Sequence, residues 1–184
     1  KLIEFGVYNK CRFVESISYD SESFGLVLNN IIDEMEKRFR VLRKYKCRDI
    51  YSLNNKYAGK KWMPPIIMIV DEWADIYYSD KRLESPLVIL AQKGRAAGIS
   101  IVLATQRPTS KIISGAIKAC FSGRVSLRVP SSIDSRIILD SSGAEKIKDV
   151  GCGYYKSQYR DMSLFRAPII DVEKDLLEVY NNVN

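Results

Sequence analysis

Two adjacent carboxylates stand directly after an apolar run in the segment "IIMIVDEWAD", residues 66–75. The run from Ile66 to Val70 predicts a buried strand, and Asp71 and Glu72 follow where its backbone would emerge. In open parallel sheets, ligands bind beyond the carboxyl ends of the strands. An Asp there can bind Mg²⁺ together with phosphate oxygens, and an adjacent Glu can orient or deprotonate a water. Taken alone, the pattern fits equally well a buried strand followed by a helix with an acidic first turn.

A second apolar strand is predicted in "ISIVLATQRP", and it ends in polar residues. Gln106 would then lie at the same sheet edge as the two carboxylates. A neutral amide there can contact a γ-phosphate or the attacking water, or it can simply tie down a loop. Arg95 precedes this strand, near the end of a predicted helix. It can be a solvated charge at a helix C-terminus, or it can reach the nucleotide of a neighbouring subunit.

The elements that must position these residues alternate between helix and strand. A long amphipathic helix is predicted from Asp20 to Lys46, with Ser21 and Ser23 as candidate N-caps. A second helix is predicted from about Glu84 to Ala97, with Gly98 as its C-cap. The other expected elements are a strand at 1–7, a short helix within 47–61, strands at 99–105 and 123–129, helices within 106–120 and at 132–140, strands near Gly153–Lys156 and Leu164–Ile169, and a helix from Asp171. This alternation predicts one α/β unit, a parallel sheet covered on both faces.

Composition excludes several classes of site. The 184 residues contain no histidine, which removes His-dependent triads and His metal ligands. The four cysteines are scattered without CxxC spacing, so neither a zinc site nor a disulfide framework is expected. The longest apolar run is far shorter than the roughly 20 residues of a membrane span, and a cytoplasmic location is expected. The net charge of +7 is compatible with nucleic-acid binding.

Several long segments together resemble one family. "IIMIVDEWADI", "LAQKGRAAGISIVLATQRP", "IDSRIILD" and "GAEKI" occur in the order and spacing of FtsK/SpoIIIE-type DNA translocases, and the resemblance extends from the first residues to about Tyr155. These are hexameric ATPases with a RecA-like core that pump double-stranded DNA through a central pore. The resemblance implies a RecA-like P-loop NTPase core, in which a mostly parallel sheet is flanked by helices, and residues 1–184 as a single motor-domain fragment.

The resemblance also implies roles for individual residues. Asp71 matches the Mg²⁺-binding Walker B Asp, Glu72 the catalytic Glu, and Gln106 the sensor glutamine. Arg95 matches the arginine finger that acts across the subunit interface. The basic positions at or near the loops that contact the phosphate backbone are matched by Arg107, Lys118 and Arg136. ATP and Mg²⁺ are the implied cofactors, and double-stranded DNA and a homohexameric ring are the implied partners.

The sequence departs from the family in four respects. No GxxxxGK[ST] segment is present, so the Walker A strand, loop and helix are missing, and we expect the 184-residue chain alone to bind ATP weakly and hydrolyse essentially none. Ser132 stands where the family commonly has a Lys, and Trp73 where a smaller or aliphatic residue is usual. The family's C-terminal winged-helix module is absent as well. Any membrane tether is expected in N-terminal regions outside this sequence.

Other functions stay open at this point. The chain could be a non-catalytic DNA-binding or oligomerisation module with the same fold. It could also be a Mg²⁺-dependent nuclease that uses Asp71, Glu72 and Asp75. Within the translocase class, the sequence does not distinguish chromosome segregation, conjugation and phage or mobile-element DNA transfer.

Overall fold

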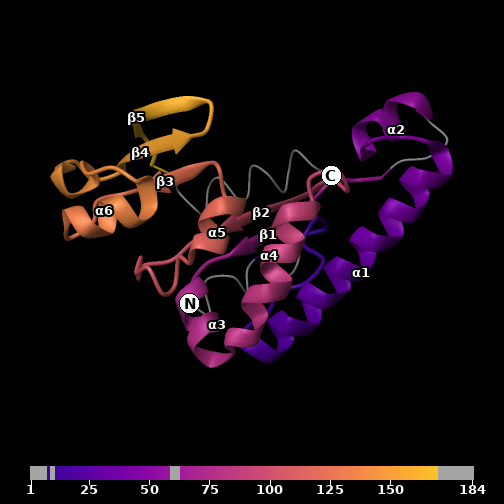
Figure 1. Cartoon of the computed structure of the whole chain (residues 1–184), viewed down its shortest axis with the longest axis horizontal. Coiled ribbons are helices and arrows are strands. Elements are labelled where there is room, and N and C mark those ends of the chain that lie inside the picture. Colours follow the sequence, from indigo (N-terminus) through magenta and orange to yellow (C-terminus); the bar gives the residue numbers. More distant parts are fainter. Residues whose placement is uncertain (1–7, 9–10, 59–62, 170–184) are drawn as a thin grey trace. The chain divides into compact units, whose positions relative to one another are not determined.

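The computed structural model describes residues 8, 11–58 and 63–169 (Figure 1). The chain divides into two compact units, one comprising Ser18–Phe121 and the other Lys1–Ile17 together with Ser122–Asn184. The interpretation of the whole chain as a single motor domain stays a prediction. The expected strand at 1–7 and the expected helix from Asp171 lie outside the described residues.

The long helix α1 (Ser21–Tyr45) confirms the helix predicted there. Its N-cap is Asp20 rather than Ser21 or Ser23. The Asp20 carboxylate accepts a hydrogen bond from the Ser23 backbone N–H at 2.7 Å, and the Asp20 backbone N–H donates to the Ser23 hydroxyl at 3.4 Å. This reciprocal pair is a capping box, and the hydrogen bond from the Ser23 backbone N–H is the main cause that lowers the pKa of Asp20.

Shorter helices follow α1 in the same unit. They are α2 (Ile50–Lys56), α3 (Trp73–Ser79), the 3-10 turn η2 (Lys81–Leu83), α4 (Glu84–Lys93) and α5 (Gly115–Cys120). Asp49 caps α2, and the hydrogen bond from the Ser52 N–H is the main cause that lowers the pKa of this carboxyl. Within the described ranges, none of the helices combines the length and the apolar content that crossing a bilayer requires.

Helix α4 ends four residues earlier than the sequence indicates. The predicted end was Ala97, but Gly94 is the C-cap. The chain reverses immediately after it, because the Ile99 N–H donates to the Gly94 carbonyl oxygen at 2.9 Å and the Gly98 N–H to the Arg95 carbonyl oxygen at 3.0 Å. Gly98 adopts a φ of 73°, which a residue without a side chain tolerates. Residues 94–98 are therefore a turn rather than the last helical turn.

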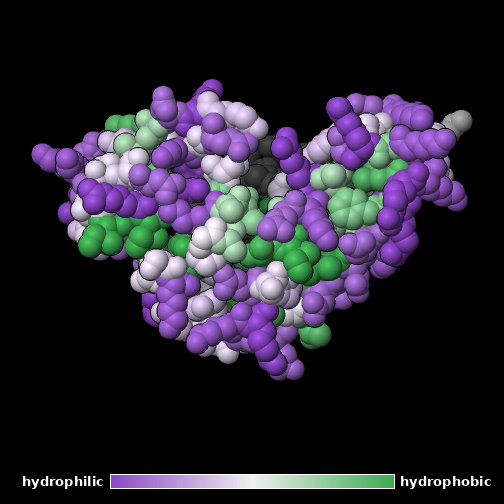
Figure 2. Space-filling view, viewed as in Figure 1, coloured by the Kyte–Doolittle hydropathy of each residue, from purple (hydrophilic) through white to green (hydrophobic). Residues whose placement is uncertain are grey.

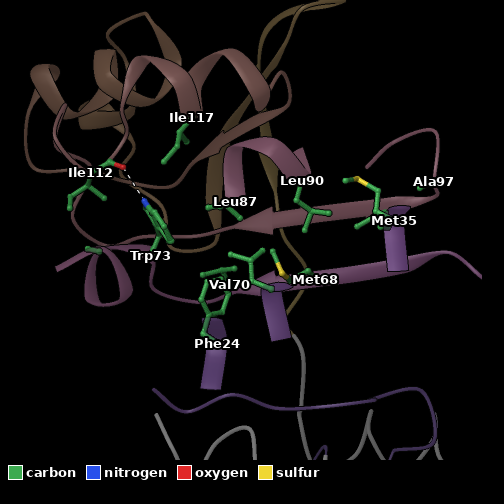
Figure 3. Close-up of a cluster of buried hydrophobic side chains, with 13 residues drawn as sticks. Phe24, Met35, Met68, Val70, Trp73, Leu87, Leu90, Ala97, Ile112 and Ile117 are labelled. Carbon is green, nitrogen blue, oxygen red and sulfur yellow. Dashed lines mark hydrogen bonds between the residues drawn. The ribbon is translucent and has the colours of Figure 1, made fainter. Parts of the chain in front are cut away.

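The two apolar strands pair as predicted. Strand β1 (Ile66–Val70) lies parallel to β2 (Ile99–Leu103), and the register runs from Ile66 opposite Ile99 to Val70 opposite Leu103. One face of this pair packs on a core to which α1, α4 and the segment before α5 contribute (Figure 3). The fully buried members include Leu28, Met35, Trp73, Leu87, Leu90, Ile112 and Ile117.

The other face of the β1–β2 pair is exposed. Ile67 is 66% exposed, Ile69 is 69% exposed and Val102 is 52% exposed. Successive side chains of a strand point to opposite faces, so these residues form an apolar surface opposite the core. The prediction of a sheet covered on both faces is wrong for the described residues, because the helices that pack on these strands contribute to one core on one face.

The second unit contains a separate antiparallel sheet. Strands β3 (Arg124–Ser126), β4 (Cys152–Ser157) and β5 (Arg160–Arg166) pair in the order β3-β4-β5. Helix α6 (Ser132–Leu139) and the 3-10 turn η3 (Ala144–Lys146) lie between β3 and β4 in the chain. The last strand starts and ends earlier than predicted, since only two residues link it to β4 in a tight antiparallel hairpin.

Trp73 is a core residue with a polar contact. Its side chain is fully buried, and the indole Nε1–H donates to the Ile112 carbonyl oxygen at 3.1 Å (Figure 3). The indole therefore joins the first turn of α3 to the segment before α5. This contact gives a structural account of the Trp that stands where the family usually has a smaller residue.

Replacement of Trp73 by Phe is expected to lower the free energy of unfolding by about 1–3 kcal/mol, because the buried Ile112 carbonyl loses its donor. Urea unfolding followed by far-UV circular dichroism measures the change. Tyr78→Phe alters a half-exposed ring on the same helix and is expected to shift stability by less than about 0.5 kcal/mol. Equal effects of the two substitutions would contradict the role assigned to the indole N–H.

Candidate functional site

The carboxyl ends of β1 and β2 meet at one edge of the sheet, and their pairing continues beyond the strands. The Ala104 N–H donates to the Val70 carbonyl oxygen at 2.8 Å, and the Trp73 N–H donates to the Ala104 carbonyl oxygen at 2.9 Å. The same register places Glu72 beside Thr105. Asp71, directly after β1, is exposed at this edge.

The Glu72 carboxylate is held by three donors. Its Oε1 accepts from the Thr105 hydroxyl at 2.5 Å and from the Ala74 backbone N–H at 3.1 Å, and its Oε2 accepts from the Gln106 backbone N–H at 2.8 Å. An ionised carboxylate offers about four acceptor positions, so about one remains, on Oε2. A carboxylate fixed in this way is oriented before any substrate arrives, and its remaining position can accept a proton or a hydrogen bond from water.

Thr105 is the contact that sequence reasoning missed. Besides donating to Glu72, its hydroxyl oxygen accepts from the Arg107 backbone N–H at 3.1 Å. The hydroxyl thus joins the carboxylate at the end of β1 to the loop after β2. No signal in the sequence identifies it, because the strand register that brings position 105 opposite position 72 is known only from the structure.

Gln106 and Arg107 lie at the same edge as the carboxylates. The Gln106 side chain is exposed, while its backbone N–H is bound to Glu72. The Arg107 guanidinium forms an ion pair with Asp75 at 4.0 Å, and both side chains are largely exposed. Pairs of this kind contribute little stability, so Arg107 can exchange Asp75 for another anion. Asp75, the third carboxylate of the nuclease hypothesis, pairs with Arg107 instead of completing a metal-binding group.

Arg95 is not brought to this edge. It is exposed in the turn that leads into the first residue of β2, whereas Gln106 follows the last residue of that strand. At about 3.3 Å per residue, the five residues of β2 separate the two edges of the sheet by roughly 16 Å. Arg95 borders a hollow that is also lined by Arg48, Asp49, Tyr51, Gln92, Lys93 and Ala96.

The remaining basic candidates lie on two helices. Lys118 is half-buried in α5, within the unit that carries the carboxylates. Arg136 is exposed in the last turn of α6, in the other unit. Ser132, where the family commonly has a Lys, is the first residue of α6.

The sequence of this chain matches known proteins. The family model for FtsK/SpoIIIE matches residues 1–110. The chain belongs to the FtsK/SpoIIIE family. It is 39% identical over 153 residues to "DNA translocase FtsK" of Treponema pallidum, and the match covers 80% of this chain and 19% of the relative. It is 35% identical over 183 residues to "DNA translocase FtsK" of Leptospira interrogans, covering 95% of this chain and 19% of that protein.

One solved structure is similar to nearly the whole of this chain. The pCW3 conjugation coupling protein TcpA, in its monomer form with ATPγS, matches with a TM-score of 0.81 and 26% identity, over 96% of this chain and 55% of that one. The mixed α/β fold of P-loop ATPase motor domains, with a parallel strand pair flanked by helices, is thereby confirmed. This FtsK/SpoIIIE chain spans about a fifth of the length of its DNA translocase relatives.

The sheet edge of this FtsK/SpoIIIE member offers few carboxylates, which is enough for an Mg²⁺ ion that is also bound to phosphate. Among the described residues, no group of three or more His, Cys, Asp or Glu could hold a metal ion by itself. Mg²⁺ keeps several waters and binds few protein carboxylates plus substrate phosphates. Asp71, exposed directly after β1, is a single carboxylate of this kind.

Replacement of Thr105 by Val in the full-length protein is expected to lower the kcat of ATP hydrolysis by roughly 10- to 100-fold, because the Glu72 carboxylate loses a charge-assisted hydrogen bond. The affinity for ATP should change little. Thr105→Ser keeps the hydroxyl and is the matched control. Steady-state ATPase assays measure both variants, and equal kcat values for Val and Ser would exclude a role for the hydroxyl.

Proposed function

We propose that this chain is part of an ATP-driven double-stranded DNA translocase, in which it supplies the catalytic carboxylates, the sensor glutamine and the arginine finger. One observation carries the proposal. Glu72, Thr105 and Gln106 are hydrogen-bonded together at the carboxyl edge of β1–β2, while Arg95 is exposed at the opposite edge. Two half-sites on opposite edges are complete only where one subunit meets another, as in a ring with head-to-tail interfaces.

The chemistry assigned to the carboxyl edge is hydrolysis of the γ-phosphate. Glu72, with about one acceptor position left, orients or deprotonates the attacking water. The Gln106 side chain contacts the γ-phosphate or that water, and its backbone bond to Glu72 ties the two together. Mg²⁺, held through Asp71, would neutralise phosphate charge. Arg95 of the adjacent subunit stabilises the charge that develops on the transferred phosphoryl group.

Exposed apolar surface supports a homo-oligomer, proposed here as a hexameric ring. Figure 2 shows green hydrophobic areas over α4 and α6 within a largely hydrophilic surface. Ile89 in α4 is 41% exposed and Ile133 in α6 is 66% exposed, besides the apolar face of β1–β2. Exposed apolar patches, rather than single apolar residues, mark interaction surfaces in soluble proteins, and the face of β1–β2 that carries Ile67, Ile69 and Val102 is such a patch. We place the working protein in the cytoplasm, with any membrane tether contributed by regions outside this sequence.

The 184-residue polypeptide alone is proposed to bind ATP weakly and to hydrolyse essentially none, since it contains no GxxxxGK[ST] loop. The decisive experiment compares it with the full-length protein. We expect duplex DNA to stimulate ATP hydrolysis by the full-length protein, and ATP to drive displacement of a third strand from a triplex. DNA binding without any ATP hydrolysis by the full-length protein would favour the non-catalytic module instead.

The DNA contacts are proposed to be to phosphates, through Arg107, Lys118 and Arg136. Lys118→Ala and Arg136→Ala in the full-length protein should each weaken binding to all duplex sequences equally, and each should reduce the slope of log K against log salt by about 1. Fluorescence anisotropy at several salt concentrations measures this. Lys81→Ala removes an equal charge from an exposed position in η2 and should leave the slope unchanged. A sequence-dependent loss would contradict contacts made only to phosphates.

A further inference from the structure

The backbone of residues 94–98 determines where Arg95 projects. The Arg95 guanidinium makes no hydrogen bond or ion pair with the residues that the structure describes. The backbone of the turn between α4 and β2 therefore determines the direction of the Arg95 side chain. An arginine that must reach a phosphate on another subunit needs this turn to be rigid, because misplacement by about 1 Å can cost roughly 100-fold in rate.

Two other helices hold the turn from outside. The Ile50 N–H, at the start of α2, donates to the Ala96 carbonyl oxygen at 3.1 Å. Arg38 of α1 donates from Nη1 to the Ala97 carbonyl oxygen at 2.9 Å. Gly98 completes the close packing, since a Cβ there would lie 2.0 Å from the Ile50 Cδ1 atom.

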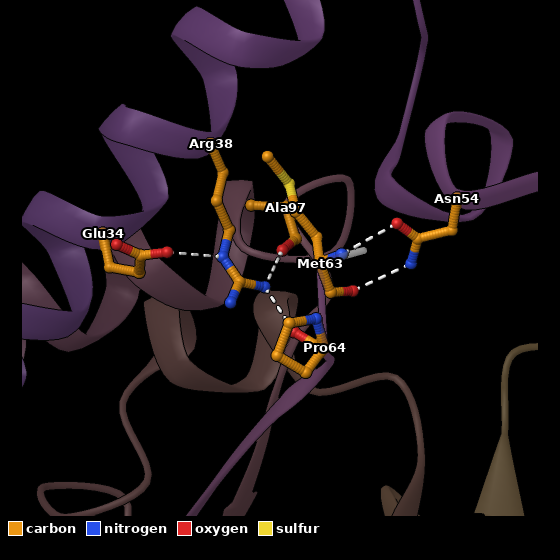
Figure 4. Close-up of polar contacts among 6 residues, drawn as sticks. All are labelled: Glu34, Arg38, Asn54, Met63, Pro64 and Ala97. Carbon is orange, nitrogen blue, oxygen red and sulfur yellow. Dashed lines mark hydrogen bonds and ion pairs between the residues drawn. The ribbon is translucent and has the colours of Figure 1, made fainter. Parts of the chain in front are cut away.

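Arg38 is a buried cation whose acceptors come from three parts of the chain (Figure 4). Its side chain is only 5% exposed, and its Nε donates to the Glu34 Oε1 at 2.9 Å. The two hydrogens of Nη1 serve two backbone carbonyls, those of Ala97 and of Pro64, the latter at 2.8 Å. Buried carbonyl oxygens need such donors, and a planar guanidinium holds several acceptors in fixed relative positions.

The Pro64 contact extends the linkage to the catalytic strand. Pro64 lies two residues before β1, and the Asn54 side chain fixes the residue in front of it by donating to the Met63 carbonyl oxygen at 2.8 Å and accepting from its N–H at 2.9 Å (Figure 4). Arg38 thus links two segments of the chain. One is the start of β1, which Asp71 and Glu72 follow, and the other is the turn that contains Arg95.

We propose that Arg38 is a positioning residue for Arg95: it fixes the 94–98 turn so that the arginine projects correctly into the neighbouring subunit's site. The inference rests on the proposed function, in which Arg95 acts in trans. It assigns Arg38 no contact with nucleotide. Its effect on hydrolysis is exerted through the Ala97 carbonyl and the backbone that follows Arg95.

The test uses full-length variants mixed in pairs. Arg38→Met keeps the aliphatic stem but removes all three hydrogen bonds, and should lower kcat roughly 10- to 100-fold with the KM for ATP within about twofold. Mixing with Glu72→Gln, which retains a well-placed Arg95, should restore activity. Mixing with Arg95→Ala should not, because neither subunit then supplies a working finger. Arg38→Lys should recover part of the kcat, and Arg40→Met, at an exposed position on the same helix, should behave as wild type.

Each other pattern overturns the inference. Rescue of Arg38→Met by Arg95→Ala, but not by Glu72→Gln, would mean that Arg38 acts on its own subunit's β1 site through Pro64. Rescue by neither, together with a failure of Arg38→Lys to recover kcat, would mean that Arg38 serves only folding. Failure of Glu72→Gln and Arg95→Ala to complement each other would instead refute the trans finger of the proposed function, and the role of Arg38 would fall with it.

Discussion

Glu72→Gln in the full-length protein is expected to lower the kcat of ATP hydrolysis by roughly 10²- to 10⁴-fold, the usual contribution of a general base. The amide cannot accept the proton of the attacking water. Its oxygen can still accept from Thr105 and Ala74, but its NH₂ group would then face the Gln106 N–H, which becomes unpaired. ATP affinity should therefore fall by no more than about tenfold.

Single-turnover hydrolysis and equilibrium binding of a fluorescent ATP analogue separate these two effects. Glu22→Gln, at an exposed position in the first turn of α1, is the matched control and should retain wild-type kcat. Normal hydrolysis by Glu72→Gln would show that Glu72 is not the base. Loss of ATP binding to the same extent as loss of hydrolysis would show that its role is structural.

The sequence could predict the location of Glu72 because two strong regularities agree. A continuous apolar run of five residues predicts a buried strand, and ligands of parallel sheets lie beyond the carboxyl ends of the strands. The same reasoning places Gln106 at that edge. Sequence reasoning could not identify Thr105 as the partner of Glu72. The pairing register of two strands depends on how they pack and cannot be deduced from the sequence of either strand alone.

Arg38 shows a second kind of limit. It stands in the basic second half of α1 with Arg40 and Arg43, which are exposed, and the residue type is the same at all three positions. Only the packing of α1 against the start of β1 and the 94–98 turn buries Arg38 and supplies its acceptors. The end of α4 was misplaced for a similar reason, since Gly94 and Gly98 are equally good stop signals and the hydrogen bonds into β2 decide between them.

Arg95→Ala in the full-length protein is expected to lower kcat by roughly 10³- to 10⁵-fold, the range found for arginine fingers in phosphoryl transfer. The expected loss is large because the proposed arginine finger supplies positive charge where negative charge develops. Arg95 lies before the first residue of β2 and Glu72 at the other end of the strand pair, which is why we propose that Arg95 acts on a neighbouring subunit. Lys93→Ala removes an exposed charge from the end of α4, the helix that precedes the turn of Arg95, and should change kcat little.

Mixing two inactive variants distinguishes action in trans from action in cis. In an equimolar mixture of Arg95→Ala and Glu72→Gln, about a quarter of the interfaces of a ring pair an intact Glu72 with an intact Arg95. Activity should therefore reappear on mixing and grow as subunits exchange. If Arg95 acted within its own subunit, no subunit of the mixture would hold both groups, and the mixture would stay as inactive as its components. Restoration of ATPase activity thus tests both the ring and the division of the site between the two edges of β1–β2.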